Sequence, residues 1–162
     1  MHAAPRHINP GHRPPLAIGD STMLLAVRPL ARAGFEADAR GCRSMVEGLE
    51  LIARRRRQHR LSKVVLVHLG GNAGLTPAHI SRALRIMGPR RILVLVIPRP
   101  REARLIRAAA RRYPRRIRVL DWARQWQAHR EYLSDRGLHL SDTGVAAFVR
   151  LCRPALRLNR GR

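Results

Sequence analysis

A serine near the start of the chain and a histidine near its end are the residues best placed to do nucleophilic chemistry. Ser21 stands in Gly19-Asp20-Ser21, where an apolar run gives way to a helical pattern. His139 follows Asp135 by four residues within one short loop. A serine hydroxyl is a weak nucleophile until a base removes its proton, and that base needs an acid to orient it. The three side chains therefore form a candidate nucleophile, general base and orienting acid.

A glycine-rich turn in the middle of the chain presents an amide side chain, that of Asn72, directly after the apolar run Val64–Val67. An amide N–H is a good donor to the oxyanion of a tetrahedral acyl-transfer intermediate. The backbone N–H of Ser21 is a second candidate donor, and a third is expected in the turn at Gly41 and Cys42. These residues form a candidate oxyanion hole.

Short apolar runs alternate with longer amphipathic stretches along the chain, and this alternation predicts the elements that position the candidate residues. The nearly continuous hydrophobic runs at 64–67 and 92–97 are typical of strands buried on both faces of a parallel sheet. The pattern predicts an α/β fold, a three-layer α/β/α sandwich with a mainly parallel, about five-stranded sheet. Strands are expected at 15–18, 35–39, 63–69, 91–97 and 117–120, and helices at 22–33, 44–59, 77–87, 100–112, 122–129 and 143–156.

In such sheets, active sites form where loops leave the carboxyl ends of the strands. Ser21 and Asn72 both fall just past a strand end, so both are expected at that edge. The domain is expected to span residues 14–157, with a flexible N-terminal tail at 1–13 and a basic C-terminal tail at 158–162.

The formal charge of +23 over 162 residues raises the question of an anionic partner. Lys63 is the only lysine among the 33 basic residues, a bias that a GC-rich genome explains as well as phosphate binding does. Aromatic residues make up 4% of the chain, too few for a base-stacking platform. We therefore expect solvated arginine faces and no specific nucleic-acid recognition, with contact to an anionic polymer or membrane surface as the alternative.

The two cysteines and the distribution of apolar residues provide the sequence evidence on thiol state and cellular location. Cys42 and Cys152 lack metal-ligand spacing and are expected to be free, mostly buried thiols, with a single disulfide as the alternative. No apolar run is long enough to cross a bilayer, and residues 1–15 do not read as a signal peptide. The chain as written is expected in the cytoplasm, or outside it if the chain is a piece of a larger exported membrane protein.

Four motif blocks stand in order along the chain, and together they carry a resemblance to a known family. The blocks are Gly19-Asp20-Ser21, Gly41-Cys42-Arg43, Gly70-Gly71-Asn72 and the segment from Asp135 to His139. This order resembles that of the SGNH (GDSL-like) hydrolases, over about residues 16–156. The resemblance is strongest to the SGNH domains at the C-terminus of acyltransferase-3-type membrane proteins, which move O-acyl groups on peptidoglycan or other cell-surface glycans. It implies an SGNH, flavodoxin-like fold.

The resemblance also implies roles. Ser21 would be the nucleophile, His139 the general base and Asp135 its orienting acid, with the oxyanion hole as above and no metal or organic cofactor. The expected activity is that of a serine-dependent ester hydrolase or O-acyltransferase, with an O-acylated (acetylated) glycan or a small acyl ester as substrate.

The sequence departs from the family in two places. The family's last block reads Asp-x-x-His, whereas the residue three before His139 is Arg136. Cys42 stands where relatives often have glycine, although its backbone N–H remains a donor.

Other interpretations remain open. The extra residue before His139 favours a catalytically inactive SGNH-like module that binds an anionic glycan or a partner, and the net charge leaves room for a nucleic-acid-associated protein. Ser21 could be only a helix N-cap, and Asp135 only a surface acid that faces arginines. His68 is interpreted as structural or pocket-lining, and Trp122 and Trp126 as core residues.

Overall fold

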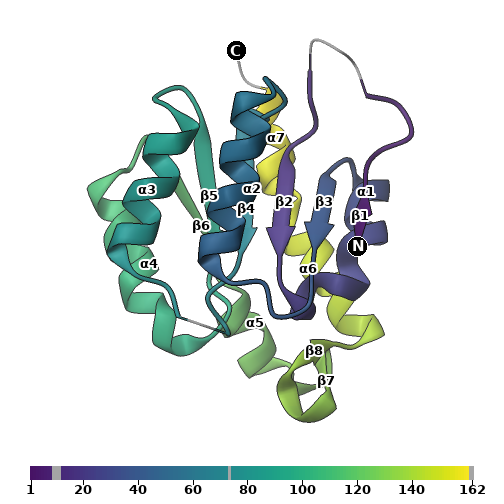
Figure 1. The fold of residues 1–162 in the computed structure, drawn as a ribbon. Coiled ribbons are helices and arrows are strands. Elements are labelled where there is room, and N and C mark those ends of the chain that lie inside the picture. The colour runs from purple at the N-terminus through teal and green to yellow at the C-terminus, as the bar shows by residue number, and fades with distance from the viewer. Residues whose placement is uncertain (9–11, 73, 161–162) are drawn as a thin grey trace.

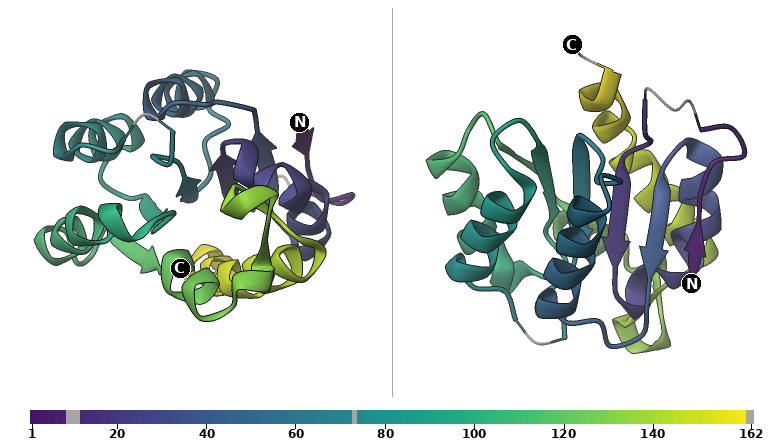
Figure 2. Two further views of the ribbon diagram at one scale, coloured as in Figure 1. Left: turned by 90° about the horizontal axis from the view of Figure 1, so that it is seen from below. Right: turned by 45° about the horizontal axis from the view of Figure 1, so that its top comes forward.

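A central sheet with helices on both faces forms three layers (Figures 1 and 2). The computed structural model describes residues 1–8, 12–72 and 74–160, apart from the side chains at 136 and 160. The α/β/α sandwich that the sequence predicted is confirmed.

The sheet has six strands in the order β1-β3-β2-β4-β5-β6. Strands β2 to β6 run parallel, and β1 pairs antiparallel with β3 at one edge. The strands are β1 (His2–Ala3), β2 (Leu16–Gly19), β3 (Glu36–Ala39), β4 (Val64–His68), β5 (Ile92–Val96) and β6 (Ile117–Leu120).

Each face of the sheet is covered by its own set of helices, and each has its own hydrophobic core. Successive side chains of a strand point to opposite faces, so Leu16 and Ile18 join one core while Ala17 joins the other. The first face carries α2 (Met45–Arg57), α3 (Pro77–Met87) and α4 (Pro100–Arg112). The second carries η1 (Ser21–Ala26), α1 (Val27–Ala33), α5 (Trp122–Ala128), α6 (Asp142–Cys152) and α7 (Pro154–Arg160).

The strand order creates a switch point beside β2. The chain leaves β2 for β3 on one side and then returns to β4 on the other side. The connections after β2 and β4 therefore diverge to opposite faces, which opens a crevice at their carboxyl ends. The loops that carry Ser21 and Asn72 leave the sheet at this crevice.

The boundaries of α3 and α4 are as predicted, because local signals set them. Thr76 caps α3 by accepting from the backbone N–H of His79, and Pro77 occupies the first helical position. Gly88, at a φ of 78°, ends the helix. Pro100 likewise begins α4.

The N-terminus departs from the prediction of a flexible tail over 1–13. His2 and Ala3 pair with Asp38 and Ala37 as the antiparallel edge strand β1, and the Met1 ammonium donates to the carbonyl of Ala39 at 2.6 Å. This strand is the sixth of a sheet predicted to have about five. At the other end, α7 extends into the predicted tail at 158–162, of which 161–162 lie outside the described residues.

Two predicted helices are each divided into two segments, and a proline lies in the first turn of each second segment. The predicted helix over 22–33 begins as the 3₁₀ helix η1, and the α-helix α1 starts at Val27. Pro29 therefore lies in the first turn of α1, where its missing N–H leaves no hydrogen bond unmade. The predicted helix over 143–156 ends at Cys152 as α6, and Pro154 starts α7. The short strands β7 (Leu133–Ser134) and β8 (His139–Leu140) were not predicted.

Candidate active site

The turn after β2 leaves Ser21 free of a capping role. Asp20 is the N-cap of η1, and its Oδ1 accepts the backbone N–H of Thr22 at 3.0 Å. Ser21 is therefore the first residue of the helix, half-buried, and it does not act as the helix cap. Gly19 is required here, because a Cβ at this position would lie 2.6 Å from the Cβ of Met23. The turn thus brings the backbone close to its own helix.

His139 and Asp135 lie on a small hairpin formed by β7 and β8, in which Ser134 pairs with His139. The 3₁₀ turn η3 (Asp135–Gly137) joins the two strands. It accommodates the one residue by which this chain exceeds the family's Asp-x-x-His spacing. Asp135 adopts a φ of 47° there, a left-handed conformation that aspartate tolerates. Its Oδ2 lies 3.0 Å from Nδ1 of His139. The sequence left open whether this carboxylate reaches the imidazole, and the hairpin shows that it does.

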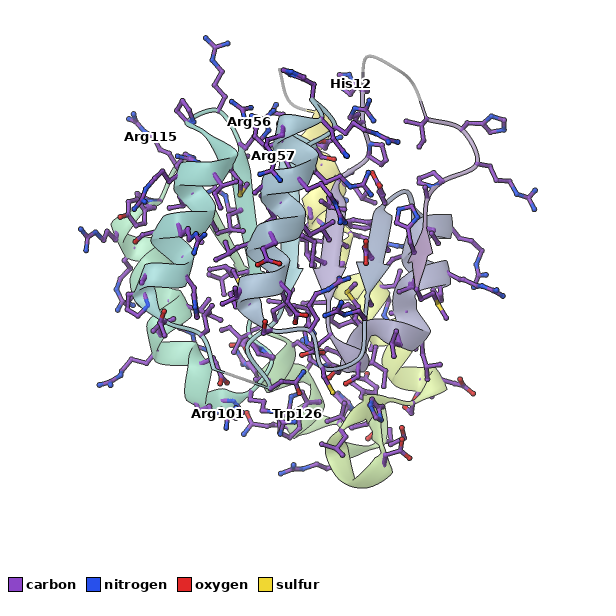
Figure 3. All side chains as sticks on the ribbon, viewed as in Figure 1. His12, Arg56, Arg57, Arg101, Arg115 and Trp126 are labelled. Carbon is purple, nitrogen blue, oxygen red and sulfur yellow. The ribbon has the colours of Figure 1, made fainter. Side chains whose placement is uncertain are left out.

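The hairpin is attached to the serine turn. The Thr22 hydroxyl donates to the carbonyl of Leu138 at 3.2 Å, across 116 residues of chain. A small cavity of about 20 Å³ lies where the two segments meet, near Trp126 at the lower end of the molecule in Figure 3. Its lining residues are Asp20, Thr22, His68, Gly71, Pro98, Arg99, Trp122, Trp126, Leu133, Gly137 and Leu138. The serine turn and the histidine hairpin therefore border one pocket.

Two tryptophans line the pocket; the prediction that they are core residues is confirmed for Trp122 and only partly for Trp126. Trp122 is buried, stacked on Tyr132 and edge-on to Phe148, and so holds the hairpin side against α6. Trp126 is half-buried and donates from Nε1 to the carbonyl of Pro98 at 3.1 Å. Its ring lines the pocket, so it is more than a core residue.

Of the candidate oxyanion-hole residues in other segments, Asn72 contacts the serine turn. Asn72 is exposed, and its Nδ2 donates to Oδ2 of Asp20 at 3.4 Å, which places the amide beside the residue before Ser21. Cys42 is exposed, at a φ of 55°, and a Cβ added at Gly41 would meet open space. The prediction of mostly buried thiols is therefore wrong for Cys42 and right for Cys152, and both are free.

Arg43 is a site residue to which the sequence assigned no role. It is buried, and its guanidinium donates to the carbonyls of Asp38 at 2.7 Å and Gly19 at 3.3 Å. A third hydrogen bond joins it to the Asp38 carboxylate at 2.7 Å. Arg43 thus ties the second motif block to the first. Its place directly after Gly41-Cys42 was the only signal in the sequence.

His68 closes the floor of the pocket at the end of β4. Its Nδ1 lies 3.9 Å from Oδ1 of Asp20, and its ring meets Phe148 edge-on at 5.2 Å. Neither ring nitrogen has a hydrogen-bond partner among the described residues. Burial lowers the pKa of His68 below its ordinary value, an effect that the nearby Asp20 carboxylate opposes. His68 is therefore neutral, and both parts of its predicted interpretation hold, since it is buried and lines the pocket.

Comparisons with solved structures place this fold in a class. The C-terminal catalytic domain of peptidoglycan O-acetyltransferase A from Streptococcus pneumoniae, solved with a methylsulfonyl adduct, superposes with a TM-score of 0.80 at 18% identity and covers 99% of this chain and 96% of that one. A GDSL-like lipase from Bacteroides thetaiotaomicron gives a TM-score of 0.68 at 14% identity, covering 88% and 87%. The chain has the fold of the SGNH (GDSL-like) hydrolases, and the resemblance predicted from its motif blocks is confirmed.

The chain is also similar in sequence to proteins that are named as O-acetyltransferases. The "Putative O-acetyltransferase" of Staphylococcus aureus (strain COL) is 30% identical over 141 residues, 82% of this chain and 23% of the relative. The "Putative peptidoglycan O-acetyltransferase YrhL" of Bacillus subtilis (strain 168) is 26% identical over 148 residues, 88% of this chain and 23% of the relative. The chain thus spans about a quarter of these relatives' length. No protein-family model matches it.

Replacement of His68 tests its neutral, buried state. In the unfolded chain the imidazole takes up a proton below about pH 6.5, whereas folded His68 stays neutral, so acid favours unfolding. We expect the His68→Phe variant to lose less stability than the wild type when the pH falls from about 7.5 to about 5.5. Urea unfolding at both pH values measures this change. The control is His59→Asn, at an exposed residue with a φ of 55°. An unaltered pH dependence in the Phe variant would contradict the assignment.

Proposed function

We propose that this chain is a catalytic domain that moves an acyl group through an acyl-serine intermediate, either to water or to a sugar hydroxyl. The observation that carries the proposal is the Asp135–His139 hydrogen bond on a hairpin attached to the serine turn through Thr22 and Leu138. An inactive binding module would not require a carboxylate paired with a histidine on a hairpin that contacts this turn.

In the proposed mechanism, the Ser21 hydroxyl attacks the acyl carbonyl and gives its proton to His139. Asp135 holds the imidazole through Nδ1, so that the other ring nitrogen is free to accept this proton. The oxyanion of the tetrahedral intermediate accepts from the Ser21 amide, an amide of the Gly41–Cys42 turn and the Asn72 side chain. The intermediate collapses, the alcohol takes the proton from His139, and the acyl group stays on Ser21.

In the second half of the reaction, His139 accepts a proton from the acceptor hydroxyl, which attacks the acyl-serine. The bond between the acyl carbon and the Ser21 oxygen then breaks, and His139 returns the proton to that oxygen. Water gives net hydrolysis, and a sugar hydroxyl gives transfer. We propose acetyl as the acyl group and a cell-wall glycan as its carrier. The names of the relatives, which refer to O-acetyl transfer and to peptidoglycan, support this choice. Such a substrate would place the domain outside the cytoplasm, as part of a longer protein. No helix among the described residues combines the length and apolar run of a membrane span.

Hydrolysis of p-nitrophenyl acetate by the chain and its Ser21→Ala variant tests the nucleophile. We expect kcat/KM to fall by about three orders of magnitude or more, because the acyl-enzyme route is lost. The matched control is Ser81→Ala on α3, which removes a hydroxyl away from the pocket and should leave the rate unchanged. Equal slow rates in all three proteins would favour the inactive binding module instead.

Asp135→Ala tests the orienting acid. The pair is solvent-exposed, so its loss should lower kcat by about 10- to 1,000-fold, less than the loss of a buried acid. Glu131→Ala, at an exposed acid beside His129, is the control. An Asp135→Ala variant with full activity would reduce the site to a Ser-His dyad.

A further inference from the structure

The end of the sheet opposite the candidate active site gathers arginine. At this end α2 stops and β4, β5 and β6 begin. In Figure 3, Arg56, Arg57 and Arg115 lie at the top, whereas Arg101 and Trp126 lie beside the pocket at the bottom. We call this surface the basic end; its residues are Arg56, Arg57, Arg60, Lys63, Arg90, Arg91, Arg115 and Arg116.

The acidic residues lie elsewhere. All ten are among the described residues, and Glu36, the first residue of β3, is the one that begins a strand. Its carboxylate is already shared by Arg55 and His2. The others fall within or after strands, in the first two turns of helices, or around the histidine hairpin. Among the described residues, no ion pair includes Arg56, Arg57, Arg60, Arg90, Arg91 or Arg115.

The basic end encloses an open hollow of about 870 Å³, lined by Arg56, Lys63, Pro89, Arg90 and Arg91. Two arginines at this end bind backbone carbonyls, and one of them, Arg91, lines the hollow. Arg91 donates to the carbonyl of Met87 at 3.0 Å, and Arg116 donates to the carbonyls of Gly88 at 2.6 Å and Arg91 at 2.9 Å. These contacts hold cationic groups in place at the C-terminus of α3.

One polar atom of the Arg91 guanidinium makes no hydrogen bond within the described residues. This atom, Nε, is buried. Burial and the charge of nearby Arg56 lower the pKa of Arg91, so the hollow already concentrates positive charge. An anion in the hollow would offset this repulsion, and an arginine fork matches the oxygens of a phosphate group.

We propose that the basic end binds a phosphodiester polymer that carries no bases, of the poly(polyol phosphate) type, with one phosphate in the hollow and its neighbours on the flanking arginines. The argument against nucleic acid is the lack of a stacking surface. Two aromatic residues lie just before or near the starts of the strands. Phe35 is buried, and Tyr113 is half-buried with Arg112 5.6 Å from its ring centre. The argument against a membrane is that no large apolar side chain lines the hollow, whose lining residues are Arg56, Lys63, Pro89, Arg90 and Arg91.

This binding would leave the candidate active site open, because the hollow and the pocket lie at opposite ends of the strands. The polymer would then hold the domain near its substrate without entering the reaction. The inference does not depend on the proposed function, since the hollow would bind the same polymer in a catalytically inactive domain.

The test measures fluorescence anisotropy of labelled poly(glycerol phosphate) of defined length across a salt series. The double variant Arg56→Gln/Arg90→Gln removes two exposed arginines of the hollow. The control Arg28→Gln/Arg150→Gln removes two exposed arginines on α1 and α6 and has the same net charge. We expect the hollow variant to bind about 10-fold or more weakly, with a salt slope lower by about 1 to 1.5, and the control to bind within about 2-fold of wild type.

Equal weakening in both double variants would overturn the proposal, because it would reduce the effect to net charge. Two further arms test the chosen ligand. An oligothymidylate with the same number of phosphates that binds more tightly than the polymer would overturn the choice in favour of nucleic acid. Binding to vesicles of phosphatidylglycerol without binding to the free polymer would overturn it in favour of a membrane. Unchanged thermal unfolding and p-nitrophenyl acetate hydrolysis in the hollow variant would show that a loss of polymer binding is local.

Discussion

A buried carboxylate at the carboxyl ends of β2 and β4 is the constraint on which the candidate site depends. Asp20 is 2% exposed, and burying a charge is costly unless hydrogen bonds satisfy it. The amide of Thr22 supplies one bond and the side chain of Asn72 another. The first bond makes Asp20 the helix cap and releases Ser21 from that role, and the second holds the Asn72 amide beside the serine turn. Asp20 therefore acts through its neighbours, and neutral His68 fills the space beneath it without adding a second buried charge.

The parallel sheet also explains why charge is divided between the two ends of the molecule. A helix that follows a parallel strand starts at the carboxyl end of the sheet, so the positive ends of the helix dipoles gather near the site and the negative ends gather opposite. Acids stabilise helix N-termini and bases stabilise C-termini. The first turns of α2, α4 and α6 contain Glu47, Glu102 and Asp142, and the last turns of α2, α3, α4 and α6 contain Arg54–Arg57, Arg85, Arg111–Arg112 and Arg150. Part of the basic end is thus ordinary helix stabilisation. Helix stabilisation does not explain the charges in the hollow. Arg90 lies after the end of α3, and the charge of Arg56 repels that of Arg91.

The histidine hairpin shows how a loop accommodates a change in spacing. One residue more than the family pattern between acid and histidine would misdirect a carboxylate on a regular strand, because successive side chains point to opposite sides. Here the turn η3 takes up the residue, and the left-handed conformation of Asp135 turns its carboxylate back toward His139. The hairpin depends in turn on Gly144 in α6, where a Cβ would lie 1.9 Å from the carbonyl oxygen of Tyr132. The motif's geometry is therefore kept by a glycine outside the motif.

The sequence by itself determined what local signals encode. Apolar periodicity predicted both ends of each of the five parallel strands to within one residue, and Thr76, Pro77 and Gly88 set the bounds of α3. The four motif blocks identified the SGNH fold and named Ser21, Asn72 and His139, because their residue types and order are readable along the chain. Tertiary structure alone decided which residues distant in sequence meet. Pairing of His2 with Asp38, burial of His68 against Phe148, the contact of Thr22 with Leu138 and the convergence of Arg56 on Arg91 all join segments that no local pattern relates. Propensity and periodicity act over a few residues, whereas these contacts arise only when the sheet brings its strand ends together.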